Sequence, residues 1–178
     1  QEIGQTEFVI RKAGEADLAD IQKLMETTVA YMENPDWFYE DGKEFLETCV
    51  KEEENAGFAV IARTKQEGIP AGCFLVEIPG DVPYNLGNDL GFSKEQLLLS
   101  AHMDTAAVAP LYRGHHLQDR MMEVCEEEMK KRGMRYLLAT VHPGNPYSLS
   151  NVQKRGYGIR ATKEKHGRSL RHILCKEI

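Results

Sequence analysis

Cysteine is scarce in this sequence, and what there is lies far apart. No C-x-x-C pair is present, which argues against a structural zinc site and against a disulfide framework. We expect the thiols to pack as small apolar side chains in a reducing compartment. The four positions are Cys49, Cys73, Cys125 and Cys175.

Long apolar runs and an excess of basic charge are also missing. No stretch reaches the roughly 18 residues of a membrane span, and the N-terminus shows no secretory pattern. With 22 Lys and Arg against 28 Asp and Glu, the net charge is −6. This argues against nucleic-acid and anionic-membrane partners. We expect a cytoplasmic protein, monomeric or homodimeric. A polyanionic ligand would have to be held by local donors.

The 178 residues fit a single compact domain over 1–178. Hydrophobic periodicity predicts its elements. Strands are expected at 8–12, 58–62, 71–78, 96–108, 135–141, 157–162 and 169–176, and helices at 14–31, 41–54, 114–132 and 146–155. This order indicates an α/β sandwich, with a mixed, mostly antiparallel sheet flanked by helices and one parallel crossover. Residues 79–93 form a long loop of the kind that often carries function.

The expected strand 96–108 has an alternating pattern. Alternation places successive side chains on opposite faces of a sheet. One predicted face holds Leu97, Leu99, Ala101 and Met103, and the other holds His102, Asp104, Ala106 and Val108.

An anion site is expected where this strand ends. Pro110 stops the strand, and Arg113 with Gly114 opens a helix. Free N–H groups at a helix start, together with its dipole, attract anions. Gly114 permits close approach of the backbone, and Arg113 adds a forked cation. A plain strand-to-helix turn is the alternative.

The stretch 108–118, VAPLYRGHHLQ, resembles motif A of the GNAT superfamily of N-acetyltransferases, V-x-P-x-x-R-G-x-G-x-G/A. The segments 141–148, VHPGNPYS, and 154–157, KRGY, resemble that superfamily's second block. The resemblance implies the GNAT fold and backbone binding of acetyl-CoA, with no metal. The cofactor contacts that it implies are Ala106, Val108, Arg113, Gly114, His115, His116, Leu117, Gln118, Asn145, Ser148 and Val152.

The sequence departs from the family pattern at three positions. His116 and Gln118 stand where the second and third glycines are usual. Their side chains must therefore turn away from the phosphates. Val152 stands where many members carry a tyrosine that protonates the leaving thiolate.

The implied reaction is attack of an amine on a thioester. It needs a donor for the oxyanion, a base for the amine and departure of the thiolate. The resemblance places the donor at the backbone N–H near Val108. His102 or Asp104 could act as the base, directly or through water, or could be a structural histidine and an ion-pair partner. Ser148 is expected to contact the cofactor rather than to act as a strong acid.

The acceptor is expected to be a small-molecule primary amine, and the acidic balance favours a cationic one. Candidate pocket residues are Tyr31, Trp37, Tyr84 and Arg168. The loop 79–93 would then act as a lid. Two alternatives stay open: a CoA-binding sensor with weak chemistry, and a protein or peptide acetyltransferase with an open groove.

Overall fold

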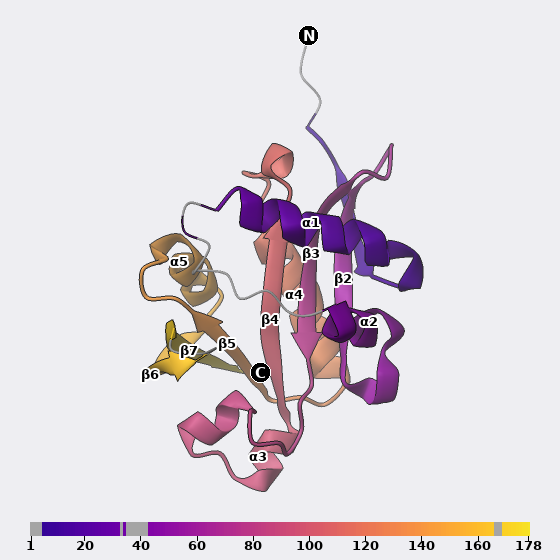
Figure 1. The fold of residues 1–178 in the computed structure, drawn as a ribbon. Helices are drawn as coiled ribbons and strands as arrows, with labels where there is room; N and C mark the ends of the chain where they lie inside the picture. Colours follow the sequence, from indigo (N-terminus) through magenta and orange to yellow (C-terminus); the bar gives the residue numbers. More distant parts are fainter. Residues whose placement is uncertain (1–4, 33, 35–42, 166–168) are drawn as a thin grey trace.

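A seven-stranded sheet runs through the computed structural model, which describes residues 5–32, 34, 43–165 and 169–178. The strand order is β1-β2-β3-β4-β5-β7-β6 (Figure 1). The strands are β1 (Phe8–Lys12), β2 (Gly57–Thr64), β3 (Pro70–Glu77), β4 (Ser100–Val108), β5 (Tyr136–Val141), β6 (Gly158–Lys165) and β7 (Ser169–Glu177). Only the β4–β5 pair is parallel among these neighbours. The predicted mixed, mostly antiparallel sheet is therefore confirmed.

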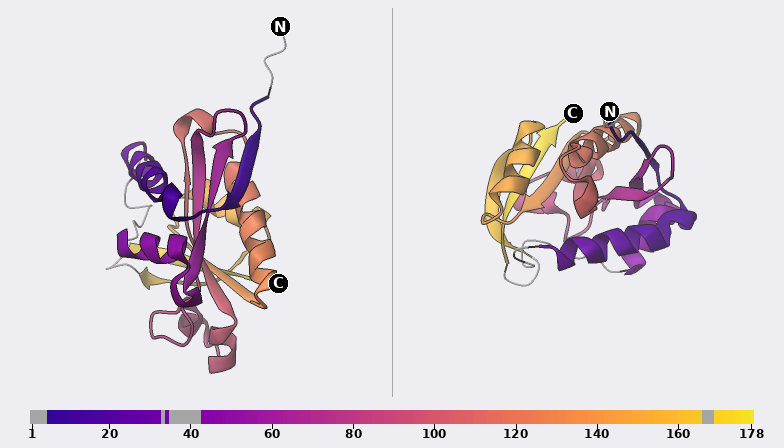
Figure 2. Two further views of the ribbon diagram at one scale, coloured as in Figure 1. Left: turned by 90° about the vertical axis from the view of Figure 1, so that its right-hand side faces the viewer. Right: turned by 90° about the horizontal axis from the view of Figure 1, so that it is seen from above.

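Helices cover both faces of the sheet, so the molecule has three layers (Figure 2). On one face, α1 (Leu18–Ala30) and α2 (Lys43–Lys51) bury a cluster against β2 and β3. On the other, α4 (Leu117–Lys131) and α5 (Pro146–Lys154) pack on the larger core cluster. Short turns of helix fill the connections: Glu15–Asp17, Glu53–Asn55, Leu86–Leu90, α3 (Lys94–Leu98) and Pro110–Tyr112. Within the described ranges, no helix is both long and apolar enough to cross a bilayer.

The expected strand over 96–108 is wrong in its first third. Residues 94–98 form α3, and β4 begins at Ser100. The cause is a capping box, in which the Ser93 hydroxyl accepts the Gln96 N–H at 3.2 Å and the Gln96 side chain accepts the Ser93 N–H at 2.9 Å. Leu97 is buried from this helix rather than from a strand.

The predicted faces of this strand are also wrong beyond Met103. The register against β3 shifts there, because Val76 pairs with Met103 while Leu75 pairs with Thr105. Asp104 is therefore the extra residue of a β-bulge, which reverses the alternation that follows.

After the bulge, the faces of β4 are exchanged. Ala106 and Val108 pack against the α4-side cluster together with Ala101 and Met103. Ala107 packs on the α1 side. His102 therefore does not share a face with Ala106 and Val108.

The segment 79–93 is ordered against the sheet. Leu86 forms a small core with Leu138 of β5 and Ile173 of β7. The buried Asn85 side chain donates to Gly80 O at 2.9 Å and to Ser100 Oγ at 3.0 Å. This segment therefore covers the β5–β7 part of the face that carries α1 and α2 elsewhere.

Candidate active site

A gap opens between the two parallel strands. The pairing of β4 with β5 ends at His102 and Leu138, although β4 continues to Val108 and β5 to Val141. The Ala109 N–H donates to Ala71 O at 2.8 Å, toward β3. Because alternate residues of a strand direct their N–H groups to opposite sides, those of Ala106 and Val108 face the gap.

A tight turn leads from the end of β4 to α4. Gly114 has a φ of +86° and His116 a φ of +57°, both in the left-handed region. These conformations delay the helix, so that α4 begins at Leu117 and not at Gly114 as predicted. His116 makes no side-chain hydrogen bond to the helix start. The first N–H groups of α4 have no partner within the helix, as an anion site requires.

The side chains of this turn lie largely outside it. Arg113 and His116 are exposed, Gln118 is half-buried and Leu117 enters the core. His115 contacts the Phe8 ring edge-on at 5.1 Å, and Tyr112 does so at 5.6 Å. The edge strand β1 thus fixes the turn through Phe8, and the main chain is left as the surface that a phosphate could meet.

The second family block forms the start of α5, on the other strand of the gap. The Asn145 side chain accepts the Ser148 N–H at 3.2 Å, and Pro146 follows as the first helical residue. This is an N-cap arrangement with proline at the first helical position. Val152 is buried in the core and Tyr147 is exposed. A contact of Val152 with the cofactor stays a prediction.

A buried ion cluster joins α4 to the C-terminal end of α5 and to β7. Glu126 of α4 is 3% exposed and accepts two hydrogen bonds of 3.0 Å from Arg155. Lys176 of β7 donates to the same carboxylate at 2.9 Å, and Arg155 also binds Asp119 at 3.0 Å. Burial alone would raise the pKa of Glu126, but the two cations outweigh it and lower the pKa. The cluster fixes α5 relative to α4.

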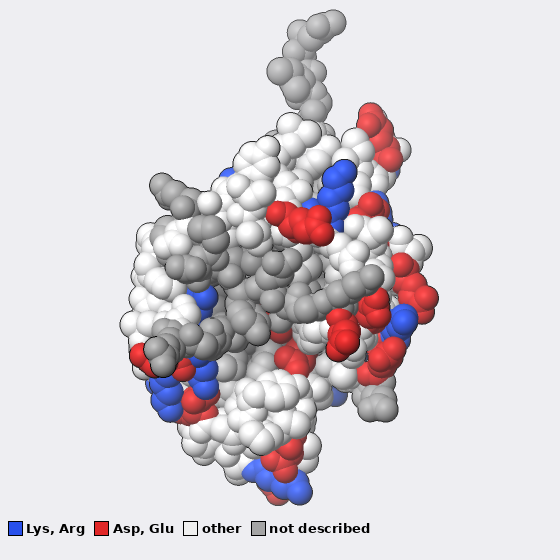
Figure 3. Space-filling view, in the orientation of Figure 1, with Lys and Arg blue, Asp and Glu red and all other residues white. Residues whose placement is uncertain are grey.

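On the α1 side of the gap, His102 is surrounded by partners. Its Nε2 accepts the Leu86 N–H at 3.1 Å, and its Nδ1 lies 3.6 Å from Glu77 Oε2. Tyr84 donates to Glu77 Oε1 at 2.6 Å. The half-buried Asp104 lies in the bulge. Figure 3 shows this face of the molecule, on which acidic and basic side chains both occur.

Glu77 is a candidate that the sequence analysis missed. It ends β3 and pairs with His102. A strand-terminal glutamate carries no local signal of function. Only the register of the hairpin with β4 could have pointed to it.

The remaining acceptor candidates are spread out. Tyr84 belongs to this group, but Tyr31 caps the end of α1 and is 66% exposed. Trp37 and Arg168 lie outside the described residues.

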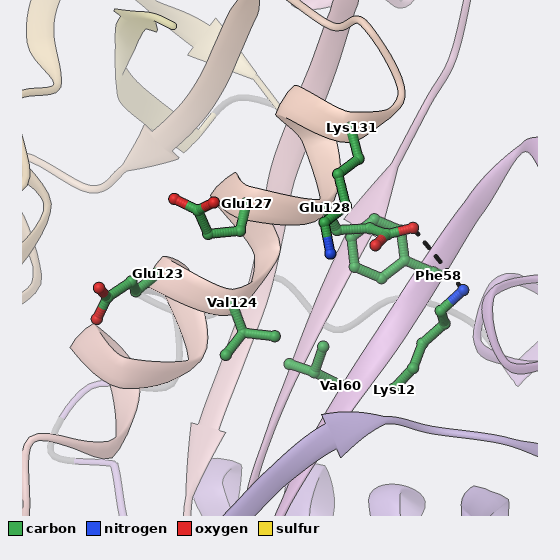
Figure 4. A pocket seen from close by; sticks show the side chains of 8 residues that line it. All are labelled: Lys12, Phe58, Val60, Glu123, Val124, Glu127, Glu128 and Lys131. Atoms are coloured by element: carbon green, nitrogen blue, oxygen red, sulfur yellow. Dashed lines mark ion pairs between the residues drawn. The ribbon is translucent and has the colours of Figure 1, made fainter.

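A cavity of about 390 Å³ lies elsewhere, between α4 and strands β1 and β2 (Figure 4). Its floor includes Phe58, Val60 and Val124, and charged side chains such as Lys12 and Lys131 stand around it. It faces the flank of α4 opposite to the one that carries the Glu126 cluster. It is therefore separate from the gap between β4 and β5.

The sequence profile described as the acetyltransferase (GNAT) family matches residues 20–157. No curated protein has a matching sequence. Among solved structures, the ribosomal-protein-S18-alanine N-acetyltransferase of Escherichia coli is similar, with a TM-score of 0.70 and 16% identity over 97% of this chain and 94% of that one. A putative acetyltransferase from Acinetobacter baylyi is also similar, with a TM-score of 0.74 and 14% identity over 99% of this chain and 94% of that one. The paia N-acetyltransferase of Thermoplasma acidophilum, solved with coenzyme A, has a TM-score of 0.66 and 17% identity over 97% of this chain and 99% of that one.

Proposed function

Because the chain belongs to the acetyltransferase (GNAT) family, we propose that it acetylates the primary amine of a small molecule. Family membership makes it an acetyl-CoA-dependent N-acetyltransferase. The observation that favours a small acceptor is the segment 79–93. Its Tyr84 and Leu86 contact Glu77 and His102 directly, so the segment lies against the end of the gap at which the two strands separate, where it would favour a small acceptor over a long peptide.

The gap and the turn at the start of α4 fit acetyl-CoA. The N–H groups around Gly114 and Leu117, with Arg113, would hold its pyrophosphate. Asn145 and Ser148 would meet the pantetheine arm from the α5 side. When bound, acetyl-CoA supplies an activated acyl group. The N–H groups of Ala106 and Val108 face the gap and would stabilise negative charge on the acyl oxygen.

The charge on the α1 side of the gap favours a cationic acceptor. Burial alone would raise the pKa of Glu77, but His102 and Tyr84 outweigh it and lower the pKa. The carboxylate therefore stays ionised at neutral pH, with Asp104 nearby on β4. An ammonium group would be attracted to it.

The test is release of free CoA thiol with a panel of acceptors. The panel holds monoamines, diamines, amino acids and short peptides with a free N-terminus, each at several concentrations. Turnover on one or more small amines with kcat/KM well above that on peptides is the expected result. Turnover on peptides alone would establish a protein acetyltransferase. Binding of acetyl-CoA without turnover across the whole panel would favour a sensor.

A further inference from the structure

The carboxylate of Glu77 lies at the point where β4 and β5 separate. Glu77 pairs with His102, which is also the last residue of β4 to pair with β5. The Glu77 side chain is 16% exposed, so it keeps contact with solvent on the α1 side of the gap. It is thus the acidic group on β3 that lies next to the gap.

The acceptor nitrogen of the His102 ring is occupied. Because Nε2 accepts the Leu86 N–H at 3.1 Å, the proton of the neutral ring must be on Nδ1. That nitrogen lies 3.6 Å from Glu77 Oε2. His102 is also only 6% exposed. The ring therefore has no lone pair directed to an incoming amine.

The Glu77 carboxylate, in contrast, has capacity to spare. Tyr84 donates to Oε1 at 2.6 Å and the His102 ring approaches Oε2. A carboxylate offers about four lone-pair sites, so about two stay available. The hydrogen bond to Glu77 raises the pKa of Tyr84 to about 12, which keeps the phenol a donor. The two neighbours hold the carboxylate in one orientation.

We propose that Glu77 accepts the proton of the acceptor amine through water, and that His102 and Tyr84 are positioning residues for it. The inference rests on the proposed amine acetylation, but not on the size of the acceptor. Asp104 is a second carboxylate near Tyr84, and its assignment is an outcome of the test.

Water is required because the distance is long. Ala106, whose N–H faces the gap, lies four residues beyond His102, which is at most about 13 Å along the strand and less because of the bulge at Asp104. An amine that attacks the acyl group near Ala106 would therefore lie some distance from the Glu77 carboxylate. One or two water molecules between them would carry the proton.

The proton balance is simple. The ammonium form of the acceptor gives one proton to Glu77 by way of water, and the neutral amine attacks the acyl carbon. The C–N bond forms, the C–S bond breaks, and the thiolate takes up the second amine proton. Glu77 returns its own proton to solvent.

The first experiment replaces Glu77 by glutamine in the full chain. General-base catalysis contributes roughly 10²–10⁴-fold, so kcat of Glu77→Gln should fall by that factor near pH 7. Acetyl-CoA affinity, measured by calorimetry, should be unchanged. The deficit should shrink as the pH approaches the pKa of the amine, because solution then supplies the neutral form. Exposed Glu95→Gln in α3 is the matched control and should behave as wild type.

Several outcomes would overturn the assignment. If Glu77→Gln stays within threefold of wild type while Asp104→Asn shows the pH-dependent loss, Asp104 is the base. If Glu77→Gln raises only KM, by the same factor at every pH, Glu77 is an ammonium anchor and not a proton acceptor.

The second experiment separates positioning from proton transfer at His102. Glutamine can accept the Leu86 N–H and donate to Glu77, but it cannot take up a proton. We therefore expect His102→Gln to keep kcat within about tenfold of wild type and His102→Leu to lose much more. If His102→Gln is as inactive as Glu77→Gln, although it binds acetyl-CoA and unfolds at the wild-type temperature, the histidine itself is the base.

The two proposals fail separately. These variants are assayed on whichever amine wild type acetylates, peptide or small molecule. Turnover on peptides alone would reject the small-molecule function and leave the Glu77 assignment testable. If no acceptor in the panel is acetylated, the transfer function and with it the role of Glu77 are both rejected.

Discussion

At the scale of single residues, the turn before α4 depends on two left-handed positions. Gly114 meets no atom within 4 Å of where a Cβ would stand, so its requirement for glycine comes from its φ of +86° alone. His116 adopts the same region with a side chain. For an L-residue this conformation costs roughly 1–2 kcal/mol.

Replacing His116 by glycine should therefore relieve backbone strain. We expect His116→Gly to raise the free energy of unfolding by up to about 1 kcal/mol, since part of the relief is offset by entropy of the unfolded chain. CoA affinity should rise as well, because the turn then exposes more main chain. Chemical denaturation and calorimetry measure the two effects. Gly114→Ala is the matched control and should shift both quantities in the opposite direction. Loss of stability in His116→Gly would contradict the strain argument.

Ser148 tests the chemistry of the leaving group. Its N–H is bonded to Asn145, and its half-buried side chain stands at the start of α5. A thiol with a pKa near 8.5 leaves without strong acid assistance. Ser148→Ala should thus lower kcat by less than about tenfold and weaken acetyl-CoA binding. A thousandfold loss of kcat with unchanged affinity would instead identify Ser148 as the acid.

At the scale of elements, the sequence predicts the long periodic pieces and misses local irregularities. Most of the strands and helices on either side of the gap follow from hydrophobic period, and the second family block locates the start of α5, whereas α4 begins at Leu117 rather than Gly114. The Asp104 bulge leaves no such trace, because one inserted residue preserves the composition of β4. Ser93-x-x-Gln96 is different. It is a readable capping box, and the apolar residues around Leu97 concealed it within an apparent strand.

The contact of Leu86 with His102 could not be predicted either. It joins a loop to a strand 16 residues away through one backbone N–H. Nothing in periodicity or motif spacing specifies such a pair. The contact matters because it occupies the acceptor nitrogen of His102, which the sequence offered as a candidate base.

The Glu126 cluster gives a test of how α4 and α5 are held together. Glu126→Gln leaves Arg155 and Lys176 without their buried charge partner. We expect a loss of about 2–3 kcal/mol, less than for a fully buried pair because the cations are partly exposed. KM for acetyl-CoA should rise more than KM for the acceptor. Glu127→Gln, which removes the charge from an exposed contact with Lys130, should cost less than about 0.5 kcal/mol.

The same substitution has a defined pH dependence. The pKa of Glu126 is lower in the folded protein than its usual value. The stabilisation is therefore present above the unfolded pKa, about 4.3, and is lost as the pH falls through the folded value. The difference in unfolding free energy between wild type and Glu126→Gln should close in acid. If the difference in unfolding free energy stayed constant down to pH 3, packing and not charge would explain the destabilisation.

At the scale of the whole molecule, the overall charge and some of the local groups at the gap differ in sign. The net charge is −6, yet the turn at the start of α4 offers Arg113 and main-chain donors to an anion. The α1 side of the gap presents Glu77 and Asp104. On the proposed function, local groups would hold acetyl-CoA against the overall field, whereas a cationic acceptor would be attracted by it.

Ionic strength should separate these contributions. The Debye length falls from about 30 Å at 0.01 M to about 8 Å at 0.15 M. Over that range, kcat/KM for a diamine acceptor should fall more steeply than for a monoamine of the same length. Steady-state kinetics at fixed pH and saturating acetyl-CoA measure the two slopes. Equal slopes would mean that the field of the protein does not steer the acceptor.

The bulge at Asp104 divides β4 into two halves whose side chains alternate between the faces of the sheet in opposite order. Up to Met103, the odd-numbered residues of the half that pairs with β5 face α4. Beyond Asp104, the even-numbered residues face α4 instead, and the strand then enters the turn that leads into that helix. Each half can therefore accept substitutions without disturbing the other. Deleting that one residue would instead rotate the whole outer half, exchanging the residues that face α4 for those that face α1.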